Sequence, residues 1–182
     1  MMSKVSWRSV LIGAAGMLSL LLAFALIVVL TGAYNVAADD RHETPVGWAL
    51  TTTMRNSVQN RASEIRVPAM TPAMVAAGAA PYKAMCQHCH GGVGASREKW
   101  AHGMRPMPPA LASAAAEWKP EEVFWIVKHG VKMSGMPSFG GSHDERALWN
   151  IAAFVKALPQ MTPEQYKDFA SAESEAAAGH SH

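Results

Sequence analysis

The sequence predicts an all-α domain that follows an N-terminal transmembrane helix. A long uncharged apolar stretch comes close after the N-terminus, and the later apolar residues recur at helical spacings. No alternating strand pattern of useful length is present in the sequence. The 182 residues are enough for one modest domain with attachments at both ends.

The apolar stretch near the N-terminus is long enough to cross a bilayer. A helix needs about 20 apolar residues for this, whereas the cores of signal peptides are shorter. We predict that residues 1–35 form a cytoplasmic flank and a transmembrane anchor, with residues 9–31 in the lipid. Lys4 and Arg8 precede the stretch, which favours a cytoplasmic N-terminus and a periplasmic remainder. The small residues at 36–38 also suit a signal cleavage site, so a cleaved signal is the alternative.

Residues 36–70 are predicted to be a periplasmic linker that is partly helical. Thr44 is a suitable cap for a helix beginning at Pro45, but the apolar residues that follow are scattered. Trp48 suits a position near the membrane interface, where aromatic rings are favoured. We expect a spacer that holds the next domain away from the bilayer.

The domain proper is predicted over residues 71–160. Thr71 is an N-cap followed by proline at the first helical position, and Pro81 is expected to kink or restart that helix. Acidic residues in a first turn and a final glycine indicate a second helix over 120–129. Apolar residues at i, i+3 and i+4 spacings predict a last helix over 143–158.

A C-terminal extension is predicted over residues 161–182. Thr162 is a suitable cap for a short helix over 163–170. The end of the chain is rich in Ala, Ser and Glu and closes with His180 and His182, which indicates a partly disordered tail.

The motif Cys86-Gln87-His88-Cys89-His90 carries the chemistry of the chain. Cys86 and Cys89 are its only cysteines, and His90 follows the second directly. Two cysteines at this spacing can each add across a vinyl group of one porphyrin, and the next histidine can then bind the iron. The motif therefore predicts one covalently bound haem c with His90 as the proximal iron ligand.

Two cysteines at this spacing have three other possible uses. A thioredoxin-like dithiol requires a βαβ context, which the sequence does not show. A structural zinc site would take a second Cys/His pair at a regular spacing. A disulfide between residues so close in sequence would close a short loop and stabilise little. Haem attachment is the reading that the motif favours most.

A six-coordinate haem iron needs a second ligand, and the segment 132–140 offers the best candidates. It is a turn rich in Gly and Pro, between two predicted helices. Met136 is the preferred ligand because Pro137 restricts it to an extended backbone. Met133 is the fallback, and the further alternatives are Met104, Met107, a histidine or an open site. Methionine opposite histidine raises the reduction potential relative to two histidines.

The nitrogen of His90 that does not bind iron needs an acceptor to fix the ring plane. The proline-rich segment 106–111 is placed to supply a backbone carbonyl for this purpose. We predict that Pro108 or Pro109 provides it and count both as cofactor-binding residues.

Taken together, these motifs resemble a class I monohaem cytochrome c of the membrane-anchored type found in Gram-negative bacteria. The resemblance covers roughly residues 71–160. It rests on Gly78, Tyr82, residues 86–91, 108–111 and 135–137, Trp149 and Phe154. It implies that the helix before the motif crosses the last helix beside Gly78, with Tyr82 and Phe154 packed there.

The resemblance implies an electron carrier on the periplasmic face of a bacterial inner membrane, and no catalytic residue. Its donor would be a quinol-oxidising complex or a dehydrogenase, and its acceptor an oxidase or a reductase. Lys99, Lys128 and Lys132 are candidates to steer an acidic partner. The net charge of +2, without a basic run interleaved with aromatics, gives no indication of nucleic-acid binding. The alternatives are a haem peroxidase or gas sensor with a labile methionine ligand, and a metal-handling protein.

Overall fold

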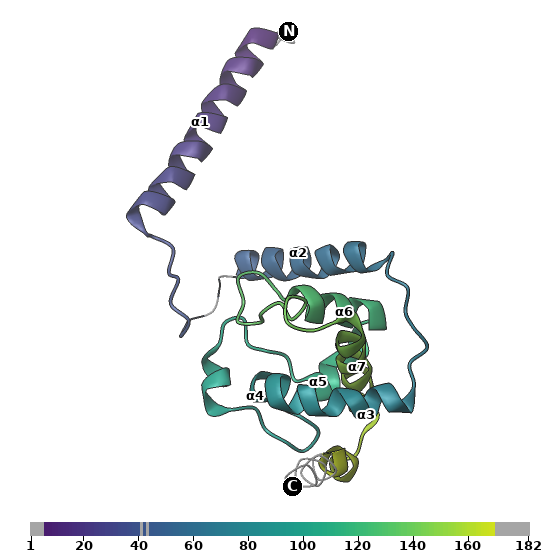
Figure 1. Ribbon diagram of the computed structural model, residues 1–182. Helices are drawn as coiled ribbons and strands as arrows, with labels where there is room; N and C mark the ends of the chain where they lie inside the picture. Colours follow the sequence, from purple (N-terminus) through teal and green to yellow (C-terminus); the bar gives the residue numbers. More distant parts are fainter. Residues whose placement is uncertain (1–5, 41, 43, 170–182) are drawn as a thin grey trace. The chain divides into compact units, whose positions relative to one another are not determined.

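The computed structural model in Figure 1 describes residues 6–40, 42 and 44–169. These residues form helices and connecting turns, and no β-strand occurs among them. The predicted all-α class is therefore confirmed. The chain divides into two compact units, Met1–Asp40 and Arg41–His182.

The first unit contains α1, Trp7–Thr31. The Ser6 hydroxyl caps its start by accepting a hydrogen bond from the backbone N–H of Ser9, and Gly32 ends it with a φ of 65°. None of its residues is buried. The helix is long and apolar enough to cross a membrane, a property that signal sequences share.

The centre of the second unit is the crossing of α3, Pro72–Pro81, with α7, Glu145–Ala157. A Cβ atom on Gly78 would lie 2.0 Å from the carbonyl oxygen of Asn150, so only glycine permits so close an approach. Beside this point the rings of Tyr82 and Phe154 pack with their centroids 5.2 Å apart. The helix crossing that the resemblance implies is therefore present.

The ends of α3, α6 and α7 lie close to the positions predicted from their capping residues. Thr71 accepts a hydrogen bond from the backbone N–H of Met74, as expected of the cap of α3. The predicted helix over 120–129 is confirmed as α6, Pro120–His129. The predicted helix over 143–158 is two residues shorter at its start, because Asp144 is the cap and accepts from the N–H of Ala147 at 2.7 Å. Leu158 belongs to the following 3-10 turn.

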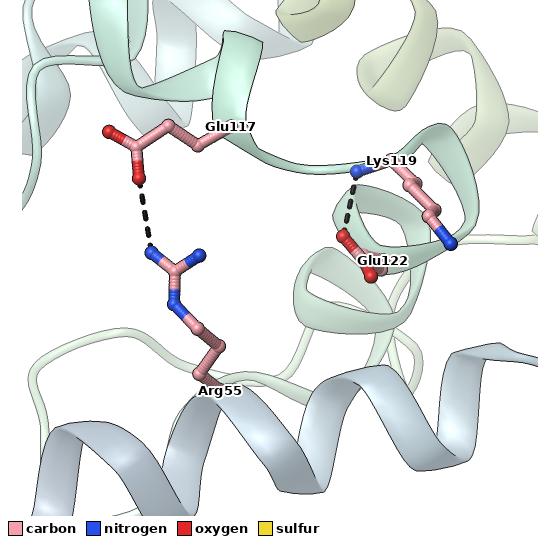
Figure 2. Close-up of polar contacts among 4 residues, drawn as sticks. All are labelled: Arg55, Glu117, Lys119 and Glu122. Atoms are coloured by element: carbon pink, nitrogen blue, oxygen red, sulfur yellow. Dashed lines mark hydrogen bonds and ion pairs between the residues drawn. The ribbon is translucent and has the colours of Figure 1, made fainter.

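Helix α6 packs beside α7 through stacked rings. The centroids of Phe124 and Trp149 lie 4.1 Å apart, with an interplanar angle of 11°. Glu122 is buried, and its carboxylate accepts a hydrogen bond from the backbone N–H of Lys119 at 2.7 Å, which closes the first turn of α6 (Figure 2). A buried carboxylate is tolerated here because this N–H partner satisfies it.

A second helix precedes the predicted domain and packs on it. This helix, α2, spans Thr44–Ala62, so it begins one residue before the predicted start. Val58 and Ala62 are buried, and the helix lies against α6 (Figure 1). Figure 2 shows a further link, the ion pair of Arg55 with Glu117 at 3.0 Å. The segment predicted as a spacer thus contributes a helix to the second unit.

Short elements connect these helices and carry the candidate site. They are η1 Tyr82–Cys86, α4 Gln87–His90, η2 Lys99–Gly103, α5 Leu111–Ala114, η3 Ala115–Glu117 and η4 Leu158–Gln160.

The short helix predicted over 163–170 is present, since residues 163–169 are helical. Its predicted end at Ala170 lies outside the described residues, as do His180 and His182.

Candidate functional site

The C-x-x-C-H motif lies on a helical segment that Pro81 reshapes. Proline has no backbone N–H and cannot continue the regular hydrogen-bond ladder of α3. The chain continues as a π-helical turn, in which the N–H of Gln87 donates to the carbonyl oxygen of Tyr82, and then enters α4. Cys86 ends the π-helical turn, and Cys89 and His90 belong to α4. All three are half-buried, so the motif is presented at the edge of the core.

The end of the motif is held from inside the core. Gly91 terminates α4 with a φ of 70°, a conformation that favours glycine. The hydroxyl of the fully buried Tyr82 donates a hydrogen bond of 2.7 Å to the carbonyl oxygen of Gly91. Burial raises the pKa of Tyr82 well above its ordinary value, with smaller contributions from Tyr166 and Cys86. The hydroxyl therefore remains a donor at any ordinary pH.

The imidazole of His90 is oriented by a backbone carbonyl. Its Nδ1 atom lies 2.8 Å from the carbonyl oxygen of Pro109. Because a carbonyl can only accept, Nδ1 carries the proton and the neutral ring keeps a lone pair on Nε2. Burial lowers the pKa of His90; the bond to Pro109 opposes this shift, and the positive charge of Arg97 adds to it. The ring is therefore in the neutral form that binds metal.

The second proline of the predicted pair has a different partner. An Nη1 hydrogen of Arg97 donates to the carbonyl oxygen of Pro108. Consecutive carbonyls of one diproline segment thus bind the arginine and the histidine. Arg97 was not among the residues predicted from the sequence, because its contact depends on how the loop after the motif folds back.

The two cysteines are free thiols in this structure. Burial raises the pKa of Cys86 to about 12, and Cys89 adds to the shift. Cys86 therefore stays protonated near neutral pH. No three side chains of His, Cys, Asp or Glu gather to hold a metal within the described ranges. The described residues therefore offer no set of ligands for the alternative hypothesis of a structural zinc site at the motif.

Met136 lies in a turn that closes on itself between α6 and α7. The backbone N–H of Met136 donates to the hydroxyl of Ser134 at 3.2 Å, and that hydroxyl donates to the carbonyl of Val131 at 2.7 Å. The N–H of Val131 in turn donates to the carbonyl of Met136 at 3.2 Å. The partly buried side chain of Met136 packs against the same core cluster as that of Cys86.

The alternative methionines are placed differently. Met133 has a φ of 60° and is 79% exposed, so its thioether lies in solvent on the tip of the turn. Met107 is also exposed. The methyl end of Met104 contacts Gly135, where a Cβ would lie 2.0 Å from its Cε. The segment that contains η2 thus reaches the turn that presents Met136.

A buried polar atom beside this contact has no protein partner. Arg105 donates from Nη1 to the carbonyl oxygens of Met104 and His102, at 2.9 and 3.0 Å. Among the described residues, the Nε atom of Arg105 is the one buried side-chain nitrogen or oxygen that has no hydrogen-bond partner. An unpaired buried donor is costly, and an anionic group of a bound cofactor would satisfy it. Haem carries carboxylates, so the orphaned donor fits this group.

These residues fit covalent haem. Two thiols and an oriented neutral imidazole follow one another on one helical segment, and the partly buried thioether of Met136 is available on a hydrogen-bonded turn. The arrangement defines a haem-binding electron-transfer cytochrome of the c type. Cys86 and Cys89 would hold the porphyrin, and His90 would bind its iron.

Comparison with known families agrees with this class. Residues 73–155 match the family described as cytochrome c oxidase, cbb3-type, subunit III. This part of the chain is a class I-type cytochrome c domain, the family that the sequence resembles. The match spans less than half of the chain and leaves out α1, α2 and the residues after Val155. No curated protein matches the chain.

Proposed function

We propose that the chain carries single electrons between membrane-bound redox complexes, with α1 in a bacterial inner membrane and the haem domain in the periplasm. One haem is bound to Cys86 and Cys89, and its iron is coordinated by His90 and Met136. When bound, the haem supplies an iron that cycles between ferrous and ferric states. The protein positions this iron and closes it to other ligands.

The single observation that carries the proposal is the contact of His90 Nδ1 with the carbonyl of Pro109 at 2.8 Å. It assigns the ring proton to Nδ1 and leaves Nε2 for iron. A hydrogen bond on the far side of a ligand histidine fixes its plane and raises its basicity. The lowered pKa of His90 favours the same neutral form.

Met136 is the better of the two neighbouring candidates for the sixth ligand. Its side chain is partly buried against the core, and three hydrogen bonds hold the turn around it. Met133 would have to leave solvent and a left-handed backbone conformation to serve as the ligand. A closed iron with histidine and methionine ligands suits electron transfer, since it offers no site for peroxide or oxygen.

The partners are proposed from the anchor and from the matching family. The family description names a subunit of a cytochrome c oxidase, so we propose an oxidase or a reductase as the acceptor. The donor would be a quinol-oxidising complex or a dehydrogenase. A tether in the same membrane raises the effective concentration of the carrier near both. Lys99 and Lys132 are exposed and offer positive charge to an acidic partner surface.

The test compares two matched variants, Met136→Leu and Met133→Leu, in the haem-loaded chain. The wild type is expected to give a six-coordinate low-spin spectrum with a methionine–iron signature. Met136→Leu should lose this signature, bind carbon monoxide in the ferrous state and show a lower midpoint potential. Met133→Leu should behave as wild type. A wild type that is high-spin and turns over peroxide rapidly would contradict the carrier proposal and support the enzyme alternative.

A further inference from the structure

The helical segment after η4 lies over the haem-attachment segment, although it is outside the matched region. Its start is capped reciprocally: the N–H of Thr162 donates to Oε1 of Gln165, and the N–H of Gln165 donates to Oγ1 of Thr162. Tyr166, one turn further on, is only 4% exposed. A tyrosine this deeply buried in a C-terminal extension must have a partner in the domain.

The partner of Tyr166 is the motif itself. Its hydroxyl donates a hydrogen bond of 2.7 Å to Oε1 of Gln87, the residue that follows Cys86. Its ring covers Gly92, where a Cβ atom would lie 2.2 Å from Cζ of the tyrosine. The ammonium of Lys83 donates to the carbonyl of Tyr166 at 3.0 Å and lies 5.0 Å from the ring centroid. Residues on both sides of Cys86 are therefore tied to one side chain.

The contact between the two segments extends beyond this ring. A Cβ on Gly94 would lie 2.9 Å from Cβ of Pro163, so the turn after the motif lies directly against the start of the C-terminal segment. The ring centroid of Phe154 lies 5.2 Å from that of Tyr82 and 6.1 Å from that of Tyr166. Tyr82 binds the Gly91 carbonyl, while Tyr166 covers the next residue. Two tyrosines thus hold the two ends of α4.

We propose that Tyr166 is a positioning residue for the haem-attachment segment: it clamps Gln87 and Gly92 so that His90 keeps one orientation in both oxidation states. This inference rests on the proposed binding of haem to Cys86, Cys89 and His90. A carrier benefits from such a clamp because a ligand that moves little between two states costs little reorganisation. The clamp is a feature of this chain, since the segment that supplies it lies beyond the matched family region.

The first test inserts one methyl group under the ring. Gly92→Ala should displace Tyr166, because the new Cβ would overlap the ring, while the φ of Gly92 is not in the left-handed region. Gly103→Ala is the matched control, since nothing lies within 4 Å of a Cβ there. In the haem-loaded full chain, amide exchange over residues 87–92 should rise roughly tenfold in Gly92→Ala, with that of α6 unchanged. The midpoint potential should fall, because water that reaches the loosened site favours the charged ferric iron.

The second test removes only the hydroxyl. Tyr166→Phe should raise exchange over the same residues by roughly fivefold, the order expected for one lost hydrogen bond. Tyr34→Phe, in the first unit, is the control.

The outcomes separate this inference from the function on which it rests. Unchanged exchange and potential in haem-loaded Gly92→Ala and Tyr166→Phe would overturn the role of Tyr166 alone. If amide exchange accelerated equally over α6 and over residues 87–92, the positioning role of Tyr166 would also be overturned. The tyrosine would then stabilise the whole fold and not the motif in particular. A wild-type chain that carries no covalent haem would overturn the proposed function and, with it, the clamp.

Discussion

His90 and Pro109 are joined by a hydrogen bond of 2.8 Å between Nδ1 and the carbonyl oxygen, 19 residues apart in sequence. The proline cannot be exchanged for a residue that lacks this carbonyl, so the contact has to be probed through the residue that holds the segment. That residue is Arg97, which donates to the carbonyl of Pro108.

Arg97→Lys is expected to loosen the diproline segment while keeping the positive charge. A lysine replaces the planar fork of donors by a single ammonium on a flexible stem. The Nδ1 proton of His90 should then exchange with solvent severalfold faster, on the order of the effect of weakening one hydrogen bond. Proton NMR of the ligand histidine measures this rate. Arg146→Lys, at an exposed position of α7, is the control and should leave the rate unchanged.

Gly78→Ala is expected to destabilise the domain more than an ordinary small-to-large change. The new Cβ would meet the Asn150 carbonyl oxygen at 2.0 Å and the Phe154 Cβ at 2.9 Å, so the two helices would have to separate. Overpacking of this kind costs about 1–3 kcal/mol, and backbone atoms cannot yield as a flexible side chain can. Denaturant unfolding measures the loss. Gly141→Ala meets nothing within 4 Å and should have little effect; equal losses in the two variants would contradict the close crossing.

Apolar burial is expected to hold α2 more strongly than the ion pair does. Val58 is 1% exposed, so Val58→Ala should cost about 2 kcal/mol of unfolding free energy. The side chains of Arg55 and Glu117 are 43% and 64% exposed, so Arg55→Ala should cost at most about 1 kcal/mol, even with the contact of Arg55 on the Trp118 ring. Added salt should reduce the Arg55 effect only. A larger loss of unfolding free energy in Arg55→Ala than in Val58→Ala would contradict this prediction.

The sequence predicted the parts of the fold that depend on local signals. The cap at Thr71, the proline and glycine that bound α6, and the motif at 86–90 all act within a few residues of themselves. The resemblance also implied the crossing at Gly78, which the structure contains.

Contacts between distant segments could not be predicted in this way. Helix α2 has scattered apolar residues, and only its tertiary packing reveals that Val58 and Ala62 are the buried ones. Arg97 and Tyr166 look like ordinary polar residues in the sequence, because their partners lie in segments brought close by folding. The haem-binding residues themselves remain predictions that the proposed experiments test.

Alkaline pH is expected to weaken the contribution of Tyr166 to stability. Burial, and secondly Cys86, raise the pKa of Tyr166 from 10.0 to about 12 in the folded chain. Because the folded value is the higher one, the unfolded chain releases this proton first as pH rises. The contribution is therefore present in full below about pH 10 and is lost between pH 10 and 12. In the haem-loaded chain Cys86 cannot ionise, so burial is the remaining cause of the shift.

Comparing Tyr166→Phe with wild type isolates this titration, because Tyr82 and the lysines are the same in both proteins. The unfolding free energy of the wild type should exceed that of Tyr166→Phe at pH 9, and the difference should shrink steadily toward pH 12. Denaturant unfolding at several pH values measures both curves. A difference between wild type and Tyr166→Phe that stays constant with pH would show that the hydroxyl titrates equally in both states, which is incompatible with its burial against Gln87.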